Sequence, residues 1–447
     1  MVIHKIRSFW DKKGGVFQTI LAASSAAFLI QGFGLGLRYL LQIFLARWLG
    51  ADEYGAYSYI FSWIQILGLL SGLGFTISLL RFIPEYITGQ KWGVLRGIVR
   101  RSRQMTLLTG SVLAGISYVL LGVFGLFKIQ PMLALVGAAV IPLYGLLQLQ
   151  VELIRSLRQI ALAYFVPMIL QPILQISLLS ILGYFLLTFD SFAALLALAI
   201  GLIPLVLLQN WLINRFVPHT AVLAATNYRT NEWLRVSLPL LYIALVVLVQ
   251  EQAGVLVVGS FLSAEETGIY MAAMKTAVLV SFVLIAVNTI VAPMIGTAFA
   301  RQDKHELQQI VRLANGLTFG FSILVGFGLI LIGKSVLGIF GYGFQSGYRL
   351  LIILALGQVI NASAGPVGYL IILTGHQREA VKVYSSTLLI NVALMLLLVP
   401  LFGSMGAAIA TSAAMMVTNI WLSLLARKCI GINTFVFLLG NQAKSIP

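Results

Sequence analysis

Twelve long apolar runs constrain what this chain can fold into more than any other feature of its sequence. A helix needs about 20 apolar residues to cross a bilayer. Only 9% of the 447 residues are charged, against about 25% in a soluble domain. Polar, Gly and Pro breaks separate runs of sufficient length at 17–48, 54–83, 104–127, 131–153, 161–187, 191–213, 236–261, 268–299, 313–337, 349–374, 383–402 and 404–426. The sequence therefore predicts an all-α membrane protein with twelve transmembrane helices.

The positions of the basic residues predict how the protein is oriented in its membrane. Cytoplasmic loops of membrane proteins are enriched in Lys and Arg. With a cytoplasmic N-terminus, the inner segments hold all of the 29 Lys and Arg residues except Arg38, Arg47, Arg81, Lys128, Lys275, Lys334 and Arg349. We therefore expect both termini in the cytoplasm. We interpret the net charge of +16 as inner-loop charge, and we expect no nucleic-acid partner.

One short motif occurs twice and divides the chain into two halves. Residues 48–57 read WLGADEYGAY and residues 261–270 read FLSAEETGIY, with five of the ten positions identical. Six predicted helices separate the copies, so two six-helix bundles of the same orientation should surround a central cleft. The predicted organisation is a cytoplasmic amphipathic N-terminus at 1–16, bundles at 17–213 and 236–426, a cytoplasmic linker at 214–235 and a cytoplasmic tail at 427–447.

Four charged residues lie within the predicted spans, namely Arg38, Arg81, Glu251 and Lys275. Charges inside a membrane are costly and usually face a cavity or a partner. The 213-residue offset between the motif copies places Glu251 at the position equivalent to Arg38. We therefore expect Arg38 and Glu251 to form an ion pair that lines the cleft and changes partners during transport. A static pair that holds the halves together, or snorkelling of the side chains to the surface, are the alternatives.

The run Ala46-Arg47-Trp48-Leu49-Gly50-Ala51-Asp52-Glu53-Tyr54-Gly55-Ala56-Tyr57, the twelve predicted helices and the basic inner loop after the second helix resemble the polysaccharide transporter family. This family includes O-antigen flippases of the multidrug/oligosaccharidyl-lipid/polysaccharide exporter superfamily. The resemblance implies a secondary transporter rather than an enzyme. It would move a polyprenyl-pyrophosphate-linked oligosaccharide, such as an O-antigen or exopolysaccharide repeat unit, from the inner to the outer leaflet of the bacterial inner membrane by alternating access.

The implied partners are the lipid-linked oligosaccharide, the bilayer and polysaccharide polymerase or ligase machinery, and a monomer can enclose the whole pathway. The implied substrate also suggests roles for individual residues. Arg38, Lys275 and Arg81 are candidates to bind the pyrophosphate, because guanidinium and ammonium groups neutralise phosphate oxygens. Arg81 can instead be a positive-inside anchor. Tyr57 and Tyr270 are candidates for sugar contact, with an interfacial aromatic belt as the alternative.

Other motifs in the chain carry no function. Residues 328–335 match the phosphate-binding loop pattern literally, but a genuine loop of this kind follows a strand, whereas these residues lie in a predicted membrane span. His4, His219, His305 and His376 are scattered over separate inner segments, so we expect no metal site. Cys429 is the single cysteine, which excludes an intrachain disulfide. No cofactor is expected.

Two further functions remain as alternatives. A multidrug or small-metabolite exporter of the same superfamily would need a more acidic cavity, and Glu251 is the one carboxylate that the sequence places well within a span. A membrane glycosyltransferase or polymerase would need a large outer catalytic loop, and the predicted outer connections are all short. The sequence therefore favours the flippase.

Overall fold

The computed structural model describes residues 16–123, 130–186 and 189–435, and this part of the chain is helical without strands. Residues 1–15 of the predicted N-terminal segment and 436–447 of the predicted tail lie outside it. The helices are α2 (Val16–Ser71), α3 (Phe75–Thr88), α4 (Trp92–Tyr118), α5 (Pro131–Ser156), α6 (Ile160–Phe165), α7 (Gln171–Leu186), α8 (Ser191–Phe216), α9 (His219–Leu223), α10 (Thr230–Phe261), α11 (Ala264–Ala277), α12 (Phe282–Ala300), α13 (Lys304–Phe340), α14 (Tyr348–Ala364), α15 (Val367–Leu373), α16 (Gln377–Phe402) and α17 (Ser404–Cys429).

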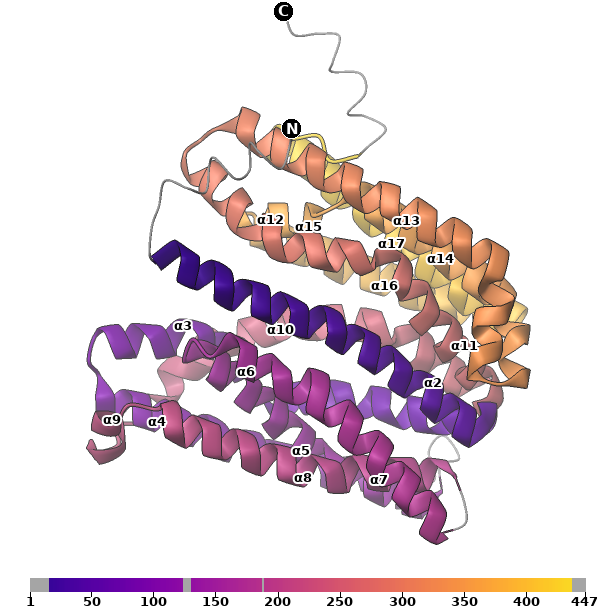
Figure 1. The fold of residues 1–447 in the computed structure, drawn as a ribbon, viewed down its shortest axis with the longest axis horizontal. Coiled ribbons are helices and arrows are strands. Elements are labelled where there is room, and N and C mark those ends of the chain that lie inside the picture. The colour runs from indigo at the N-terminus through magenta and orange to yellow at the C-terminus, as the bar shows by residue number, and fades with distance from the viewer. Residues whose placement is uncertain (1–15, 124–129, 187–188, 436–447) are drawn as a thin grey trace, which may run out of the picture.

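Gly50 folds the first helix back on itself. Among the described residues, eleven helical stretches are long and apolar enough to cross a membrane, and the first of them, Ile30–Thr88, has 59 residues. A straight helix of that length would extend about 90 Å, three times the hydrocarbon core of roughly 30 Å. Gly50 breaks it with φ 77° and ψ 174°, a conformation that glycine adopts without steric cost. The stretch therefore forms two antiparallel spans (Figure 1). With this stretch counted as two, the eleven stretches give twelve spans, and the predicted all-α fold is confirmed.

The helices form two groups that follow the order of the chain (Figure 1). In the N-terminal group, α5 packs against α2, α4 and α8, and its Leu149, Leu153 and Ile154 are fully buried. In the C-terminal group, α14 packs against α13 and α17. A second buried cluster, separate from the main core, joins α12, α13, α15, α16 and α17 at one end of this group. The apolar runs therefore provide both the membrane-facing surface and the helix–helix core.

Two of the predicted spans are interrupted in the C-terminal group. A short 3-10 segment at Val278–Ser281 separates α11 from α12. Gly365, with φ 61°, and Pro366 separate α14 from α15. Non-helical backbone inside a membrane is tolerated where it is buried in protein or lines a cavity, and Gly365 and Pro366 line the cavity described below.

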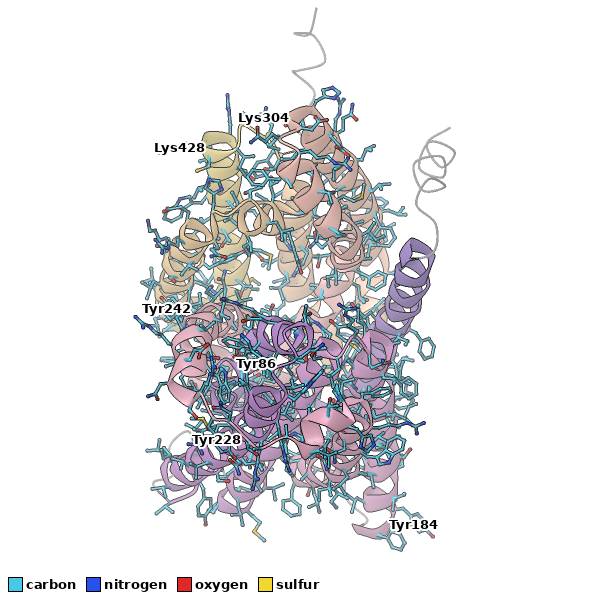
Figure 2. All side chains as sticks on the ribbon, turned by 90° about the vertical axis from the view of Figure 1, so that its left-hand side faces the viewer. Tyr86, Tyr184, Tyr228, Tyr242, Lys304 and Lys428 are labelled. Carbon is cyan, nitrogen blue, oxygen red and sulfur yellow. The ribbon has the colours of Figure 1, made fainter. Side chains whose placement is uncertain are left out.

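The chain connections rich in basic residues gather at one end of the molecule. In Figure 1 the start of α4, the short α9 and the turn between α12 and α13 lie toward the left-hand side. Figure 2 looks at that side, with Lys304 and Lys428 at the edge of the C-terminal group and Tyr228 over the N-terminal group. The opposite end holds the turn within α2 and the start of α11. The two ends of the molecule therefore differ in charge.

Candidate functional site

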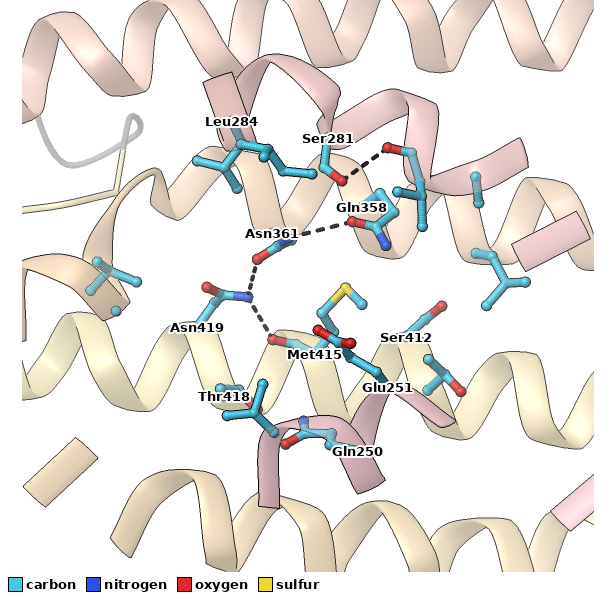
Figure 3. A pocket seen from close by; sticks show the side chains of 18 of the residues that line it. Gln250, Glu251, Ser281, Leu284, Gln358, Asn361, Ser412, Met415, Thr418 and Asn419 are labelled. Carbon is cyan, nitrogen blue, oxygen red and sulfur yellow. Dashed lines mark hydrogen bonds between the residues drawn. The ribbon is translucent and has the colours of Figure 1, made fainter. Parts of the chain in front are cut away.

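A cavity of about 570 Å³ opens within the C-terminal group, between α10, α11, α14 and α17, with residues from α12, α15 and α16 completing its wall. Its polar lining consists mainly of amides and hydroxyls (Figure 3). The amides come from five helices and include Gln250, Asn288, Gln358, Asn361, Asn391 and Asn419. Because polar groups within a membrane usually face a solvated or functional space, this cavity is the candidate site.

Hydrogen bonds hold part of the amide cluster in place (Figure 3). The Asn419 amide nitrogen donates to the Asn361 side-chain oxygen at 3.0 Å and to the Met415 carbonyl oxygen at 2.9 Å. The Asn361 amide nitrogen donates in turn to the Gln358 side-chain oxygen at 3.4 Å. By contrast, the buried side-chain oxygens of Gln250, Asn288 and Asn391 have no hydrogen-bond partner among the described residues. Such groups are costly to leave unpaired, so the cavity wall retains unused acceptors.

Glu251 and Lys275 are the two charged residues that line the cavity. They attract each other electrostatically, and Arg38 acts on Lys275 as a neighbouring like charge. The Arg38 guanidinium donates to the Pro167 carbonyl oxygen at 3.2 Å. The three charges therefore gather where the two halves meet.

The ion pair expected between Arg38 and Glu251 is absent from the ion pairs of the described residues. The charged neighbour of Glu251 is Lys275 instead. The reason is the packing of α11 against α2, which brings Lys275 to the junction, while the Arg38 side chain turns toward the π-helical segment Val166–Leu170. Arg38 and Glu251 thus do not pair in this structure, although they occupy equivalent positions in the two halves.

Arg81 and the two candidate tyrosines lie away from the cavity lining. Arg81 is exposed on α3, with its guanidinium carbon 5.8 Å from the centroid of the Phe82 ring. Tyr57 is 2% exposed and its hydroxyl accepts a hydrogen bond from Gln175 at 2.8 Å. Tyr270 is fully buried, and its hydroxyl forms a hydrogen bond of 3.1 Å with the hydroxyl of Thr411. Neither ring offers a face to a sugar in this conformation, because both are packed inside the bundle.

The sequence alone does not identify the amide cluster. Its members are isolated Asn and Gln residues in apolar helices, distributed over five separate segments. The signal that was available is their position inside predicted spans, where neutral polar groups also carry a cost. Only the folded structure brings these amides to one wall.

The two copies of the repeated motif touch each other through their glycines. A Cβ placed on Gly55 would lie 1.7 Å from the Ala264 carbonyl oxygen, and one on Gly268 would lie 2.1 Å from the Ala51 carbonyl oxygen. Ala51 and Ala264 occupy the same position in their copies, so the contact is reciprocal. Nearby, the hydroxyls of Tyr39 and Thr276 hydrogen-bond at 3.0 Å across the same junction. Glycine is therefore required at both positions for α2 and α11 to approach this closely.

A family model described as polysaccharide biosynthesis protein matches residues 20–299, well over half of the chain. The chain belongs to this family. The chain is also 22% identical over 169 residues to the probable low-salt glycan biosynthesis flippase Agl15 of Haloferax volcanii. That match covers 37% of this chain and 35% of the length of Agl15.

The fold of this chain is shared with transporters of known structure. An inward-facing multidrug resistance MATE family transporter of the MOP superfamily matches with a TM-score of 0.75 at 15% identity, over 95% of this chain and 100% of the other. The lipid II flippase MurJ, in an inward closed conformation, matches with a TM-score of 0.71 at 16% identity, over 91% of this chain and 87% of the other. The chain therefore has the fold that the resemblance implies.

Proposed function

We propose that this protein is a flippase that carries a polyprenyl-pyrophosphate-linked oligosaccharide from the inner to the outer leaflet of a bacterial plasma membrane. The observation that carries the proposal is the cavity, which combines an amide-rich wall with Lys275, and Arg38 lies near this lysine at the junction of the two halves. Membership of the polysaccharide biosynthesis family supports it. The similarity to proteins described as a glycan biosynthesis flippase and a lipid II flippase agrees with it.

The cavity suits the two polar parts of such a substrate at different places. A pyrophosphate needs cations, and Lys275 with the nearby Arg38 supplies them at the junction. Sugars carry hydroxyl groups that both donate and accept hydrogen bonds, as amides do. The unpaired oxygens of Gln250, Asn288 and Asn391 can accept from sugar hydroxyls. The oligosaccharide would therefore occupy the C-terminal group while its pyrophosphate stays near Lys275.

Alternating access requires a seal that opens, and the contact between Gly55 and Gly268 fits that role. The contact lies at the end of the molecule opposite the basic connections. Lys and Arg are enriched on the cytoplasmic side of membrane proteins, so the glycine contact would face outward. In this structure the seal is closed, and separation of the two motif copies would release the substrate to the outer leaflet.

Replacing the amide wall should abolish selectivity for the sugar and thereby tests the function. In proteoliposomes, the wild-type protein should flip a fluorescent polyprenyl-pyrophosphate-linked oligosaccharide faster than the bare polyprenyl pyrophosphate. The double variant Gln250→Met and Asn391→Leu keeps side-chain size but removes two of the unpaired amide oxygens that line the cavity. We expect it to flip both lipids at the same rate, since each lost hydrogen bond is worth roughly 1 kcal/mol.

The measurement is the time course of quenching by a membrane-impermeant reductant, with empty liposomes as the baseline. Wild-type protein that flips neither lipid above this baseline would refute the flippase. A double variant that retains the wild-type preference for the oligosaccharide would refute the role of the amides only.

The orientation can be tested with the native cysteine. Cys429 is exposed at the end of α17 and is the single cysteine of the chain. A membrane-impermeant maleimide should label it in inverted membrane vesicles and leave it unlabelled in intact cells. The matched control is Cys429→Ser combined with Ser346→Cys, which moves the thiol to the exposed connection between α13 and α14. We expect the opposite labelling pattern for the control, and the same pattern in both proteins would disprove the proposed topology.

A multidrug or small-metabolite exporter is the second candidate function. Glu251 lines the cavity and could attract a cationic drug. Lys275 is its charged neighbour and carries the opposite charge, and the rest of the polar lining is neutral. The lining therefore fits a neutral sugar chain attached to an anion better than it fits a cation.

A further inference from the structure

A second cavity, of about 410 Å³, lies in the N-terminal half between α4, α8 and α9, and shares no lining residue with the first. Arg96, Arg100 and Arg103 all line it. Their spacing of four and three residues on α4 places them on one face of that helix. No acidic residue lines the cavity. We call this cavity the arginine pocket.

Arg103 has no partner for most of its guanidinium group. Its Nε and one terminal nitrogen are buried and make no hydrogen bond to any described residue. Arg96 differs, because it donates to the Ala224 carbonyl oxygen at 2.8 Å and so fixes the segment after α9. None of the three arginines takes part in an ion pair of the described residues. Buried charged groups without a counter-charge are costly. No acidic residue lines the pocket, so its counter-charge would have to be an anion from outside the chain.

The remaining lining of the pocket is largely apolar. Val99, Leu107, Val217 and Val222 contribute to it, and Leu107 and Val222 are 39% and 43% exposed. The pocket therefore combines a cationic wall with an open apolar rim. Figure 1 places α9 and the start of α4 side by side at the basic end of the molecule. This is the level at which lipid phosphates lie when the apolar helices span the bilayer.

We propose that the arginine pocket binds the phosphate group of an anionic membrane lipid, with the start of its acyl chains on the apolar rim. Arginine binds phosphate oxygens in a bidentate geometry, and basic pockets between transmembrane helices on the cytoplasmic side bind lipid head groups. Free phosphate shares the head-group chemistry but would leave the apolar rim uncovered. This proposal is independent of the transported substrate.

The test is lipid binding to the purified full-length protein, measured by native mass spectrometry in a neutral detergent. The probes are phosphatidylglycerol, phosphatidylcholine as the zwitterionic lipid, and inorganic phosphate. We expect the wild-type protein to bind phosphatidylglycerol at least tenfold more tightly than phosphatidylcholine. Arg100→Gln combined with Arg103→Gln should remove this preference. The matched control, Arg427→Gln with Lys428→Gln, removes two exposed charges from the other half and should keep it.

A second variant covers the case in which the double arginine variant fails to fold. Val217→Glu places a carboxylate among the three arginines and supplies the missing partner from within the chain. We expect it to lose phosphatidylglycerol binding while its melting temperature stays equal to or above that of the wild type. If the control and the arginine variant lost the preference for phosphatidylglycerol equally, the binding would be general charge attraction, and the proposal for the arginine pocket would be wrong. Displacement of phosphatidylglycerol by inorganic phosphate, with phosphate bound in its place, would overturn the assignment to a lipid.

Discussion

Gly268→Ala should trap the transporter with its outer seal open and lower flipping at least tenfold. A Cβ on Gly268 would lie 2.1 Å from the Ala51 carbonyl oxygen, and neither backbone can move aside without separating α2 from α11. The alanine also favours the helix by roughly 1 kcal/mol over glycine, so the loss should come from the contact and not from weaker secondary structure. Gly55→Ala should behave in the same way, because the contact is reciprocal.

Flipping in proteoliposomes and thiol accessibility together check this prediction. With Cys429→Ser as the background, Ser412→Cys places a reporter on the cavity wall. A maleimide added from the outer side should reach it in Gly268→Ala and not in the protein with Gly268. Gly316→Ala is the matched control, because a Cβ there meets nothing within 4 Å. Wild-type flipping by Gly268→Ala, or an unreachable reporter in that variant, would show that the glycine contact is not the seal.

Lys275→Gln should reduce flipping of the lipid-linked oligosaccharide by roughly tenfold to a hundredfold. A hydrogen bond to a charged group contributes roughly 1.5–3 kcal/mol, and each 1.4 kcal/mol is about tenfold in affinity. Lys275 lines the cavity, and Arg38 adds a second positive charge close to it. Lys334→Gln is the matched control, since Lys334 is exposed on α13 and should leave the rate unchanged.

The double variant Lys275→Gln with Glu251→Gln separates the two roles that Lys275 can have. If Lys275 only neutralises Glu251, then removing both charges should restore flipping. If Lys275 binds the pyrophosphate, the double variant should stay as slow as Lys275→Gln. We expect the second result, and recovery of the wild-type rate would remove Lys275 from the substrate site. The flipping rate of each variant, divided by the amount of protein reconstituted, is the quantity to compare.

The fold could be predicted from the sequence because its determinants are local or regularly spaced. Runs of about 20 apolar residues specify spanning helices without reference to the rest of the chain, and backbone groups in lipid must be satisfied within each helix. The repeated motif, 213 residues apart, predicted two halves. The division of Ile30–Thr88 at Gly50 was also predictable, since glycine lies at the polar break between two such runs.

The site depended on which helix faces meet, and this the tertiary structure decided. Equivalent positions suggested that Arg38 would pair with Glu251, but the packing of α11 on α2 gives Lys275 that place. Tyr57 and Tyr270 have the right chemistry for a sugar, yet both are buried. The amide wall and the arginine pocket gather side chains from several helices. Helix rotation and pairing are set by long-range packing, so composition and periodicity determine that these helices span the membrane, and only the folded chain determines which polar groups share a cavity.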